Sequence, residues 1–509
     1  MHILYRTTCS RLLAVVAAIL LATLAACSSS DSNDKGNADA HTSNVASPLV
    51  TQASGGYGRA SGGLRYDVTQ YGYEEREYFF EGTAETFPPA AESSAPYRSR
   101  MIVWTPKDPS HFNGTTVVEW AHVSVGDFDL TYELKSLSPM LEAQGYAFVL
   151  VSAQAQGVCG TNPDACSASS LRGVDPERYA SLHHPGADYS FDIFNQALHA
   201  IKYPSGTAPL GNLVTRFIIA AGFQPQSDRS TPVGDPGRDR PPFGVAGPLN
   251  GYLASEAATV RLADAFYLNS AAPLVEPAEY PAPTLHHLDE SAIRREPAPN
   301  SRNHVTWEVI GATHLDPWSA AQFKVPRPGE PAPLLSRAEE EARRANFEEF
   351  GQAPGTVEQN CVTLYPAHYT KNAAVVALRE WLETGVRAPE PPHAERVPIP
   401  PETATMRLSR DSDGNAIGGL RSPIVQVPVA SYNGEGCLVT GTMTPFLPER
   451  LAELYPTHQS YVEQLKAAVD EAVTGRMLLC HDAEIIMRKA SASLIGGSDA
   501  FLAVPDCAL

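Results

Sequence analysis

Three strand-like runs of this chain are each followed by residues that suit acyl-transfer chemistry. Gly222 follows one run and opens a turn, Asp289 and Glu290 follow another, and His314 follows a third in a Gly-Ala-Thr loop. Acyl transfer needs a nucleophile lifted clear of a sheet, a histidine that takes its proton, and a carboxylate that orients the histidine. The chain therefore offers a base in His314 and two neighbouring candidates for the carboxylate.

Each of these residues also has a purely structural interpretation. His314 is alternatively a buried structural histidine, and residues 289–290 are alternatively a solvated pair of carboxylates at a strand end. Asp316 lies two residues after His314, and we expect it to hydrogen-bond within its loop. The catalytic interpretation requires the three strands to lie in one sheet.

The order of strands and helices along the chain predicts such a sheet. Apolar runs that suit buried strands alternate with amphipathic runs typical of helices, which indicates βαβ units and a mostly parallel sheet. The expected strands cover residues 78–82, 99–104, 115–120, 146–152, 213–221, 283–288 and 305–310, with a further one at 424–429. The expected helices cover residues 132–144 (interrupted at Pro139), 191–202, 336–350, 373–384 and 461–473.

The N-terminal segment is typical of an exported protein. Two arginines precede an apolar run, residues 12–24, that is too short to span a bilayer as a mature helix. Residues 24–27 are Leu-Ala-Ala-Cys, which resembles the lipobox of bacterial lipoproteins; an ordinary secretory signal cut nearby is the alternative. We therefore expect a signal peptide over residues 1–26 and a lipid on Cys27. That lipid alone would hold the protein at the bacterial cell envelope, outside the cytoplasm.

The rest of the chain divides by composition into three parts. Residues 27–59 are rich in small and polar residues and cannot bury enough apolar surface to order themselves, so we expect a flexible tether there. Residues 60–390 contain the alternating strands and helices of the main domain. Residues 391–509 begin with a proline-rich connector, and we expect them to form a C-terminal extension packed on that domain.

Six cysteines remain after the signal segment and the lipid site. An even number outside the cytoplasm predicts three disulfides. Cys159 and Cys166 close a short Gly/Asn/Pro loop and are the best-supported pair. The other two pairs follow only by elimination and are Cys361–Cys437 and Cys480–Cys507.

Charge and motif content exclude several classes of partner. The chain has 509 residues and a formal net charge of −19, which argues against binding to nucleic acid or to anionic membrane surfaces. It contains no Cys-x-x-Cys or His-x-x-x-His spacing. We therefore expect neither a metal nor a cofactor.

Six segments, taken together, resemble a bacterial family of exported α/β-hydrolase-domain proteins over most of the mature chain. They are Val-Glu-Trp-Ala-His-Val-Ser (118–124), Ser-Ala-Gln-Ala-Gln-Gly (152–157), Asp-Pro-Glu-Arg-Tyr (175–179), His-Pro-Gly-Ala-Asp-Tyr-Ser-Phe-Asp-Ile-Phe-Asn-Gln (184–196), Trp-Glu-Val-Ile-Gly-Ala-Thr-His (307–314) and Asp-Gly-Asn-Ala-Ile-Gly-Gly-Leu-Arg-Ser-Pro (413–423). The resemblance implies an α/β-hydrolase fold, with a mostly parallel central sheet flanked by helices, loop-rich insertions and a C-terminal extension.

The resemblance also implies roles for the polar residues. In this fold the chain order is nucleophile, then acid, then histidine, which makes His314 the base. By family register Glu290 is the acid that orients it, with the adjacent Asp289 as the alternative.

The loop after the 115–120 strand supplies a backbone N–H to the oxyanion hole in this fold. Ala121, His122 and Val123 are the candidate donors. His122 is alternatively a satisfied polar residue at a strand end.

The nucleophile is where the sequence departs from the family. The family pattern at the turn is roughly Gly-x-Ser-Gln-Ser, and an ungapped alignment places Gln224 in the serine position, facing the pocket. With one inserted residue Pro225 takes that position instead, and the nearest hydroxyl, on Ser227, lies two or three places too far along. Residues 224–248 contain six prolines, which excludes a long helix there. This stretch is either a loop insertion or an out-of-frame part of the gene.

Two functions follow as alternatives. The first is a lipid-anchored extracytoplasmic hydrolase of small-molecule ester or related acyl bonds, with weak or no turnover because the serine is replaced. The second is a catalytically inactive pseudoenzyme that binds a small ligand or an envelope component. The missing serine favours the second, and the retained histidine and acid motifs favour the first.

Overall fold

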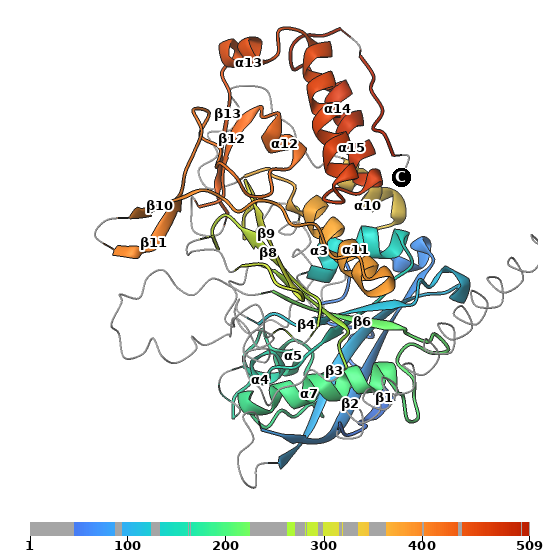
Figure 1. Ribbon diagram of the computed structural model, residues 1–509. Coiled ribbons are helices and arrows are strands. Elements are labelled where there is room, and N and C mark those ends of the chain that lie inside the picture. Colours follow the sequence, from blue (N-terminus) through green and yellow to red (C-terminus); the bar gives the residue numbers. More distant parts are fainter. Residues whose placement is uncertain are drawn as a thin grey trace, which may run out of the picture. The chain divides into compact units, whose positions relative to one another are not determined.

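The computed structural model in Figure 1 describes most of the chain after residue 44. The described residues are 45–86, 94–123, 133–160, 162, 164–223, 262–269, 280, 282–293, 299–314, 318, 334–345, 363–399, 402–435, 440–499 and 501–507. Residues 47–509 form one compact unit.

A nine-stranded sheet forms the centre of this unit, in the order β1-β2-β3-β5-β4-β6-β7-β8-β9. Its strands are β1 (Leu49–Gln52), β2 (Tyr73–Glu85), β3 (Ser94–Pro106), β4 (Thr115–Trp120), β5 (Ala147–Val151), β6 (Phe217–Phe223), β7 (Ala265–Asn269), β8 (Thr284–Asp289) and β9 (His304–Val309). Strands β5, β4, β6, β7, β8 and β9 pair in parallel, and β1, β2 and β3 add an antiparallel edge. The prediction of a mostly parallel sheet is confirmed.

The central strands are apolar because helices cover both of their faces. Every residue of β5, Ala-Phe-Val-Leu-Val, is buried. Such continuous apolar runs are typical of parallel sheets that are covered on both sides. Strand β6 ends two residues later than predicted, so Gly222 pairs with Leu268 inside the strand instead of opening the turn.

Side chains of consecutive residues in β4 show which helices cover which face. Trp120 packs on Phe191 and Phe194 of α7 (Ser190–Lys202). Glu119 points to the other face, where its carboxylate accepts the N–H groups of Glu133 and Leu134 at the start of α3 (Glu133–Ala143). Because neighbouring strand residues face opposite ways, α7 covers one face and α3 the other.

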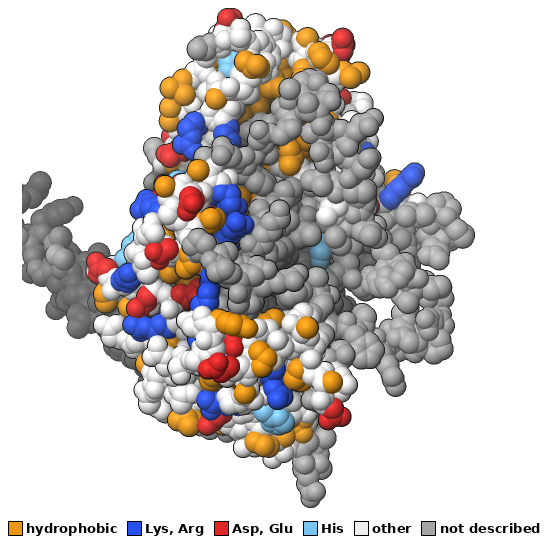
Figure 2. Space-filling model, turned by 180° about the vertical axis from the view of Figure 1, so that it is seen from behind, with side chains coloured by type: hydrophobic (Ala, Val, Ile, Leu, Met, Phe, Trp, Pro, Cys, Tyr) orange, Lys and Arg blue, Asp and Glu red, His pale blue; other side chains and the backbone are white. Residues whose placement is uncertain are grey.

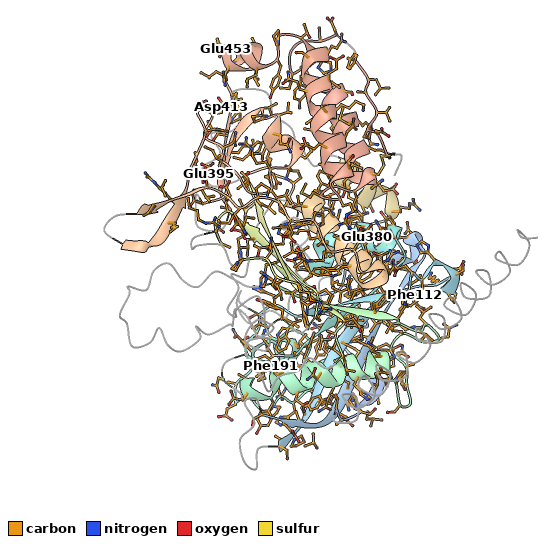
Figure 3. All side chains as sticks on the ribbon, in the orientation of Figure 1. Phe112, Phe191, Glu380, Glu395, Asp413 and Glu453 are labelled. Carbon is orange, nitrogen blue, oxygen red and sulfur yellow. A yellow bond between two sulfur atoms is a disulfide. The ribbon has the colours of Figure 1, made fainter. Side chains whose placement is uncertain are left out.

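Helix α11 (Ala367–Thr384) joins α3 on its face, where it contacts β6, β7 and β8 (Figure 1). Phe191 on α7 and Glu380 on α11 mark these two helical layers in Figure 3. Helix α3 runs through Pro139, where an interruption was predicted. The proline cannot donate to the carbonyl of Lys135, and the Ser138 hydroxyl donates to that oxygen instead (3.1 Å).

Shorter helices and a C-terminal group complete the unit. The short helices are α4 (Ala155–Cys159), α5 (Leu171–Val174), α6 (Pro176–Tyr179) and α10 (Arg337–Ala345), with 3-10 turns at Val68–Tyr71, Pro109–His111 and Ala187–Tyr189. The C-terminal elements are β10 (Arg396–Ile399), β11 (Glu402–Leu408), α12 (Pro423–Gln426), β12 (Ala430–Asn433), β13 (Thr442–Pro445), α13 (Pro448–Leu454), α14 (His458–Thr474) and α15 (Cys480–Ala492).

The C-terminal elements share the apolar core of the sheet. Leu420, Val425 and Tyr432 belong to the same buried cluster as Leu285 and Trp307 of the sheet. The C-terminal part of the chain is therefore integral to the unit.

Two boundaries differ from the predictions. The predicted strand at 424–429 is wrong: Pro423 opens a helical turn there, α12, because proline suits the first helical position. The predicted tether extended to residue 59, but Leu49–Gln52 form β1 and pair with β2. The folded part therefore begins before the predicted boundary, since Val50 is buried in the sheet edge.

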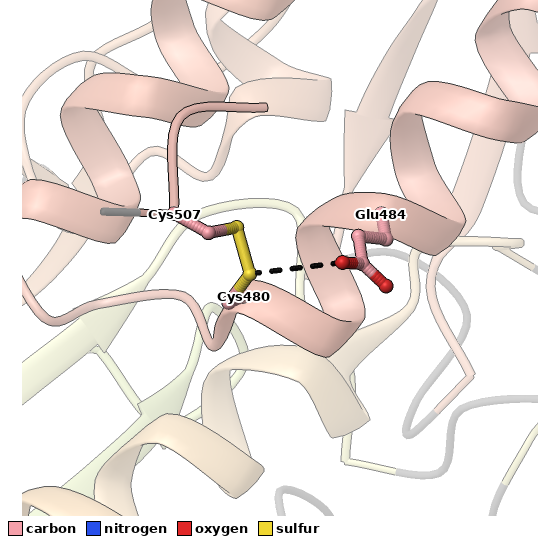
Figure 4. A group of neighbouring side chains, drawn as sticks. All are labelled: Cys480, Glu484 and Cys507. Carbon is pink, nitrogen blue, oxygen red and sulfur yellow. Dashed lines mark hydrogen bonds between the residues drawn. A yellow bond between two sulfur atoms is a disulfide. The ribbon is translucent and has the colours of Figure 1, made fainter. Parts of the chain in front are cut away.

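Two of the three predicted disulfides are confirmed. Cys159 bonds to Cys166, and Cys480 bonds to Cys507 (Figure 4). The third predicted pair, Cys361–Cys437, lies outside the described residues, as does Cys27.

Candidate active site

The carboxyl ends of β8 and β9 bring a histidine and an aspartate together. Asp289 is the last residue of β8, and His314 follows β9 after a four-residue loop. Nδ1 of His314 lies 3.6 Å from Oδ2 of Asp289, and the two side chains are 8% and 1% exposed. Because Nδ1 faces the carboxylate, Nε2 lies on the opposite side of the ring. This is the arrangement in which a carboxylate orients a general base.

Asp289 is held in place by the turn that follows it. Its Oδ1 accepts the backbone N–H of Ser291 (2.9 Å) and also the Ser291 hydroxyl. These two bonds use one carboxylate oxygen and leave the other turned toward His314. The turn after β8 therefore sets the direction of the Asp289 carboxylate.

Glu290 points away from His314, contrary to the role given to it from the sequence. Its carboxylate accepts the N–H groups of Gly311 (2.8 Å) and Gly434 (2.7 Å) and pairs with Nη2 of Arg410 (2.9 Å). Burial raises the pKa of Glu290, and Arg410 opposes that shift. The physical reason for the correction is the alternation of side chains at a strand end, which sends neighbouring residues to different sides.

The loop after β4 also reaches this edge. His122 is 7% exposed, and burial together with the nearby His314 lowers the pKa of His122 to about 3. His122 is therefore neutral near pH 7. The influence of His314 on this pKa puts His122 within electrostatic range of the proposed base.

One of the predicted oxyanion donors is already in use. The Ala121 N–H donates to the carbonyl of Val151 inside the sheet (2.9 Å). The Ala121 N–H is therefore not the oxyanion donor. His122 and Val123 stay as the candidates.

Two glutamines hold the loop after β4 from the side. Nε2 of Gln154 donates to the carbonyl of Ala121, and Nε2 of Gln156 donates to the carbonyl of Val123, each at 3.3 Å. The bond to the Ala121 carbonyl fixes a peptide plane and thus the direction of the His122 N–H. The Ser-Ala-Gln-Ala-Gln-Gly motif that suggested the family therefore contains residues that position this loop.

A buried polar network under the site was not foreseen from the sequence. On β7 and β8, Asn269 and His287 contact each other (3.3 Å), and His287 also contacts the Thr370 hydroxyl of α11 (2.9 Å). Asn269 donates to Glu133 of α3 (2.6 Å), which lies 3.8 Å from Nζ of Lys371. The signal in the sequence was a polar residue at or near the end of each apolar strand, which those strands would not carry for packing alone.

Several predicted site residues lie outside the described residues. They are Gln224, Ser227 and Asp316. The described backbone of β6 ends at Phe223, immediately before the position assigned to the nucleophile.

Two cavities and one cluster of ligand-type atoms lie elsewhere in the described structure. A cavity of about 390 Å³ lies between the start of α11 and the helices α12 and α14, and one of about 180 Å³ lies between α3, α11 and α15. Neither is lined by His314 or Asp289. Cys480, Glu484 and Cys507 approach one another closely (Figure 4), but their two sulfurs form a disulfide and leave no thiolate to bind a metal.

The family of the chain follows from a comparison with known proteins. A family model described as "Alpha/beta hydrolase domain" matches residues 42–488. The chain belongs to this family. The strand order and the sites at the ends of β8 and β9 agree with that assignment, and the predicted α/β-hydrolase fold is confirmed.

Individual relatives add little to the assignment. No curated protein matches the chain. Among solved structures, the chain is similar to Candida antarctica lipase A (8% identity, 44% of this chain and 41% of that one, TM-score 0.20) and to an alpha-beta serine hydrolase homologue from Coxiella burnetii (12% identity, 46% and 88%, TM-score 0.24). It is also similar to the esterase Est22 (10% identity, 43% and 64%, TM-score 0.24). These values are too low to bear on substrate.

Proposed function

We propose that this protein hydrolyses ester or related acyl bonds of small molecules, with His314 as general base and Asp289 as the residue that orients it. The observation that carries the proposal is the approach of His314 Nδ1 to Asp289 Oδ2, 3.6 Å apart at the ends of two parallel strands of an α/β-hydrolase domain. The loop after β4, with the His122 and Val123 amides, would stabilise the oxyanion.

The chemistry assigned to these residues is a proton shuttle. An attacking hydroxyl or water gives its proton to Nε2 of His314 as its oxygen bonds to the acyl carbon. The bond from that carbon to the leaving oxygen then breaks, and His314 returns the proton to the leaving oxygen. If the attacker is a protein hydroxyl, water then attacks the acyl carbon with the same help from His314, the bond to the protein oxygen breaks, and that oxygen regains its proton. Asp289 holds the ring and stabilises its positive charge between the two transfers.

The sequence limits the expected rate. Gln224 or Pro225 stands where the family carries its serine, and loss of a triad nucleophile costs on the order of a millionfold in kcat. An oxyanion hole and a binding site alone leave roughly 10³–10⁴-fold over the reaction in water. The attacking group is therefore water, or the hydroxyl of Ser227, and the protein is a slow hydrolase.

The missing serine favours a second candidate, a pseudoenzyme that keeps the pocket and binds a small ester-like ligand or an envelope component. The two candidates differ in one measurement, the hydrolysis of short p-nitrophenyl esters by the purified protein. A hydrolase predicts turnover above background that His314→Ala abolishes and that the same change at the exposed His481 of α15 leaves intact. Binding without turnover would support the pseudoenzyme, and turnover that survives His314→Ala would refute the assignment of His314.

The proposed location is the bacterial envelope, with the chain held by a lipid on Cys27. The apolar run before Cys27 and the two disulfides support an oxidising compartment. No helix in the described part of the chain is long and apolar enough to cross a membrane. Figure 2 shows acidic and basic side chains interspersed over the described part of one face. Incorporation of labelled palmitate that Cys27→Ala abolishes would support this location, and incorporation by the variant would contradict it.

A further inference from the structure

Glu290 is a buried carboxylate that the proposed chemistry does not use. Its side chain is fully buried, and a buried charge is costly unless partners compensate for it. Three donors do so: the N–H groups of Gly311 and Gly434 and the guanidinium of Arg410. We call these four residues the Glu290 junction.

The junction ties together the two loops that carry the proposed catalytic pair. The Glu290 N–H donates to the carbonyl of Ala312 (3.1 Å), while the Glu290 carboxylate accepts the N–H of Gly311 (2.8 Å). The loop after β8, which begins next to Asp289, is thus bonded in both directions to the loop that leads to His314. These two bonds continue the pairing of β8 with β9, which ends at Asp289 and Val309, into the loops that carry the aspartate and the histidine.

The other half of the junction comes from the C-terminal part of the chain. Nη2 of Arg410 contacts the carboxylate of Glu290 (2.9 Å), Oδ1 of Asn433 (2.8 Å) and the carboxylate of Glu435 (3.0 Å). Gly434 lies so close to the His314 loop that a Cβ there would collide with the carbonyl oxygen of Ala312. The close approach requires glycine at this position.

We propose that Glu290 is a positioning residue through which the C-terminal segment 402–435 completes the active site. The inference rests on the proposed function, because it assigns Glu290 the task of holding the His314 loop against Asp289. Glu290 touches no reacting atom in this account. It acts through Gly311 and Ala312, and Arg410 fixes its carboxylate in the direction that allows this.

The substitution Glu290→Gln tests the proposal with little change in shape. A glutamine has one acceptor oxygen, whereas the carboxylate of Glu290 accepts from three donors on two oxygens. The amide NH₂ would face either the Gly311 N–H or the Gly434 N–H and Arg410, and it would repel them. The His314 loop should therefore move or loosen.

Glu308 provides a matched control. It is also buried, on β9, and it also pairs with an arginine, Arg396, and accepts a backbone N–H, that of Ala394 (2.7 Å), from the C-terminal part of the chain. The partners of its carboxylate, Arg396, Ala394 and His393, all lie outside residues 310–314. Glu308→Gln thus removes a similar buried ion pair without touching the His314 loop.

The experiment compares both full-length variants with the wild type in two measurements. One is the kcat and KM for p-nitrophenyl butyrate. The other is hydrogen–deuterium exchange of peptides covering 305–314 and the sheet core 146–152. For Glu290→Gln we expect kcat to fall about 100-fold, as for a misplacement of about 1 Å, with KM within about twofold and faster exchange confined to 305–314. For Glu308→Gln we expect kcat within about threefold of the wild type, even if the variant melts at a lower temperature.

Each outcome decides the proposal. Equal losses of kcat in the two variants, or unchanged exchange at 305–314 in Glu290→Gln, would overturn it. If the wild type shows no turnover, the proposed function fails, yet the exchange measurement still decides whether Glu290 holds the loop. If Glu290→Gln does not fold, Arg410→Lys replaces it in the experiment. This change keeps the positive charge but loses the multiple contacts of the guanidinium, and we expect a smaller increase in hydrogen–deuterium exchange over the same residues, 305–314.

Discussion

Two buried charge clusters, at opposite ends of the sheet, are built differently. At the antiparallel edge, Glu77 pairs with Arg100 and Arg178 and accepts the hydroxyl of Tyr179, all at hydrogen-bond distance. At the other end, Asp289 faces His314 across 3.6 Å, a distance longer than a hydrogen bond. The first cluster satisfies permanent charges, and the second places a carboxylate beside a ring whose charge can change.

The difference separates charges that stabilise the fold from charges that take part in the proposed catalysis. The Glu77 carboxylate is bound by two guanidinium groups and the Tyr179 hydroxyl, and the cluster serves to join β2, β3 and α6. Histidine titrates near neutral pH, so a carboxylate at its Nδ1 side changes what its Nε2 can do. Burial alone therefore does not mark the active site, and neither does a neighbouring histidine, since the buried Glu308 also lies 3.4 Å from the part-exposed His393. What sets Asp289 apart is a partner histidine that is itself buried.

The substitution Glu77→Gln should break the structural cluster and spare the chemistry. Removing one partner of a buried ion pair typically costs about 3–5 kcal/mol, so we expect the free energy of unfolding to fall by about that amount. Urea unfolding measures this, and the kcat of the folded protein should not change. Glu81→Gln on the same strand, where Glu81 is part-exposed beside Arg98, is the control and should cost less than about 1 kcal/mol.

Equal destabilisation by Glu77→Gln and Glu81→Gln would contradict the distinction. A tenfold or larger loss of kcat in Glu77→Gln would contradict it as well.

Acid should destabilise the whole unit, because several imidazoles are buried in the neutral form. Burial lowers the pKa of His122 and His287 to about 3, and that of His184 and His304 to about 4. The unfolded chain then binds more protons below its histidine pKa of about 6.5, so stability is full above that pH and is lost as pH falls toward 4. Each imidazole that stays neutral in the folded protein lowers the free energy of unfolding by about 2 kcal/mol at pH 5. Glu142, whose pKa burial raises to about 7, acts in the opposite direction, as do Glu75 and Glu290, whose pKa values burial also raises. Burial lowers the pKa of His286 and His368 as well, so the histidines are the larger group.

Melting temperatures between pH 8 and pH 5 measure this effect. We expect them to fall steadily below pH 6.5. A melting temperature that stays constant or rises on acidification would show that these imidazoles are not buried in the neutral form.

Replacement of Gln154, which supports the loop after β4, should have a smaller effect on kcat. Gln154→Ala removes the bond to the Ala121 carbonyl, and we expect kcat to fall about tenfold because one loose oxyanion donor costs less than a lost one. Gln426→Ala removes a similar side-chain bond, to the Arg421 carbonyl, at an exposed position of α12 and should leave kcat unchanged. A similar kcat for the two variants would show that Gln154 does not position the loop.

The fold was largely predictable from the sequence, and the acid was not. Apolar runs such as 146–152 revealed the sheet because burial on both faces demands continuous apolar residues. The direction of each side chain at the end of β8 decides between Asp289 and Glu290. An alignment with the family motif could not show which of these two neighbouring carboxylates faces His314. The partner of Glu290 lies 120 residues away, at Arg410, so no local pattern reveals it.

The C-terminal part was predicted least well. The run 424–429 alternates apolar and polar residues like a strand, but Pro423 and the core around Tyr432 favour one helical turn. Four apolar residues of the run, Ile424, Val425, Val427 and Val429, are buried. Burial pattern alone could not choose between a strand and a helical turn.

The most direct test of the central claim is a double-mutant cycle on Asp289 and His314. We expect Asp289→Asn to lower kcat/KM for p-nitrophenyl butyrate about 100-fold and His314→Ala to lower it about 1000-fold. If Asp289 acts through the ring of His314, the double variant will be no slower than His314→Ala alone. A fully active Asp289→Asn, or two effects that multiply in the double variant, would contradict the account.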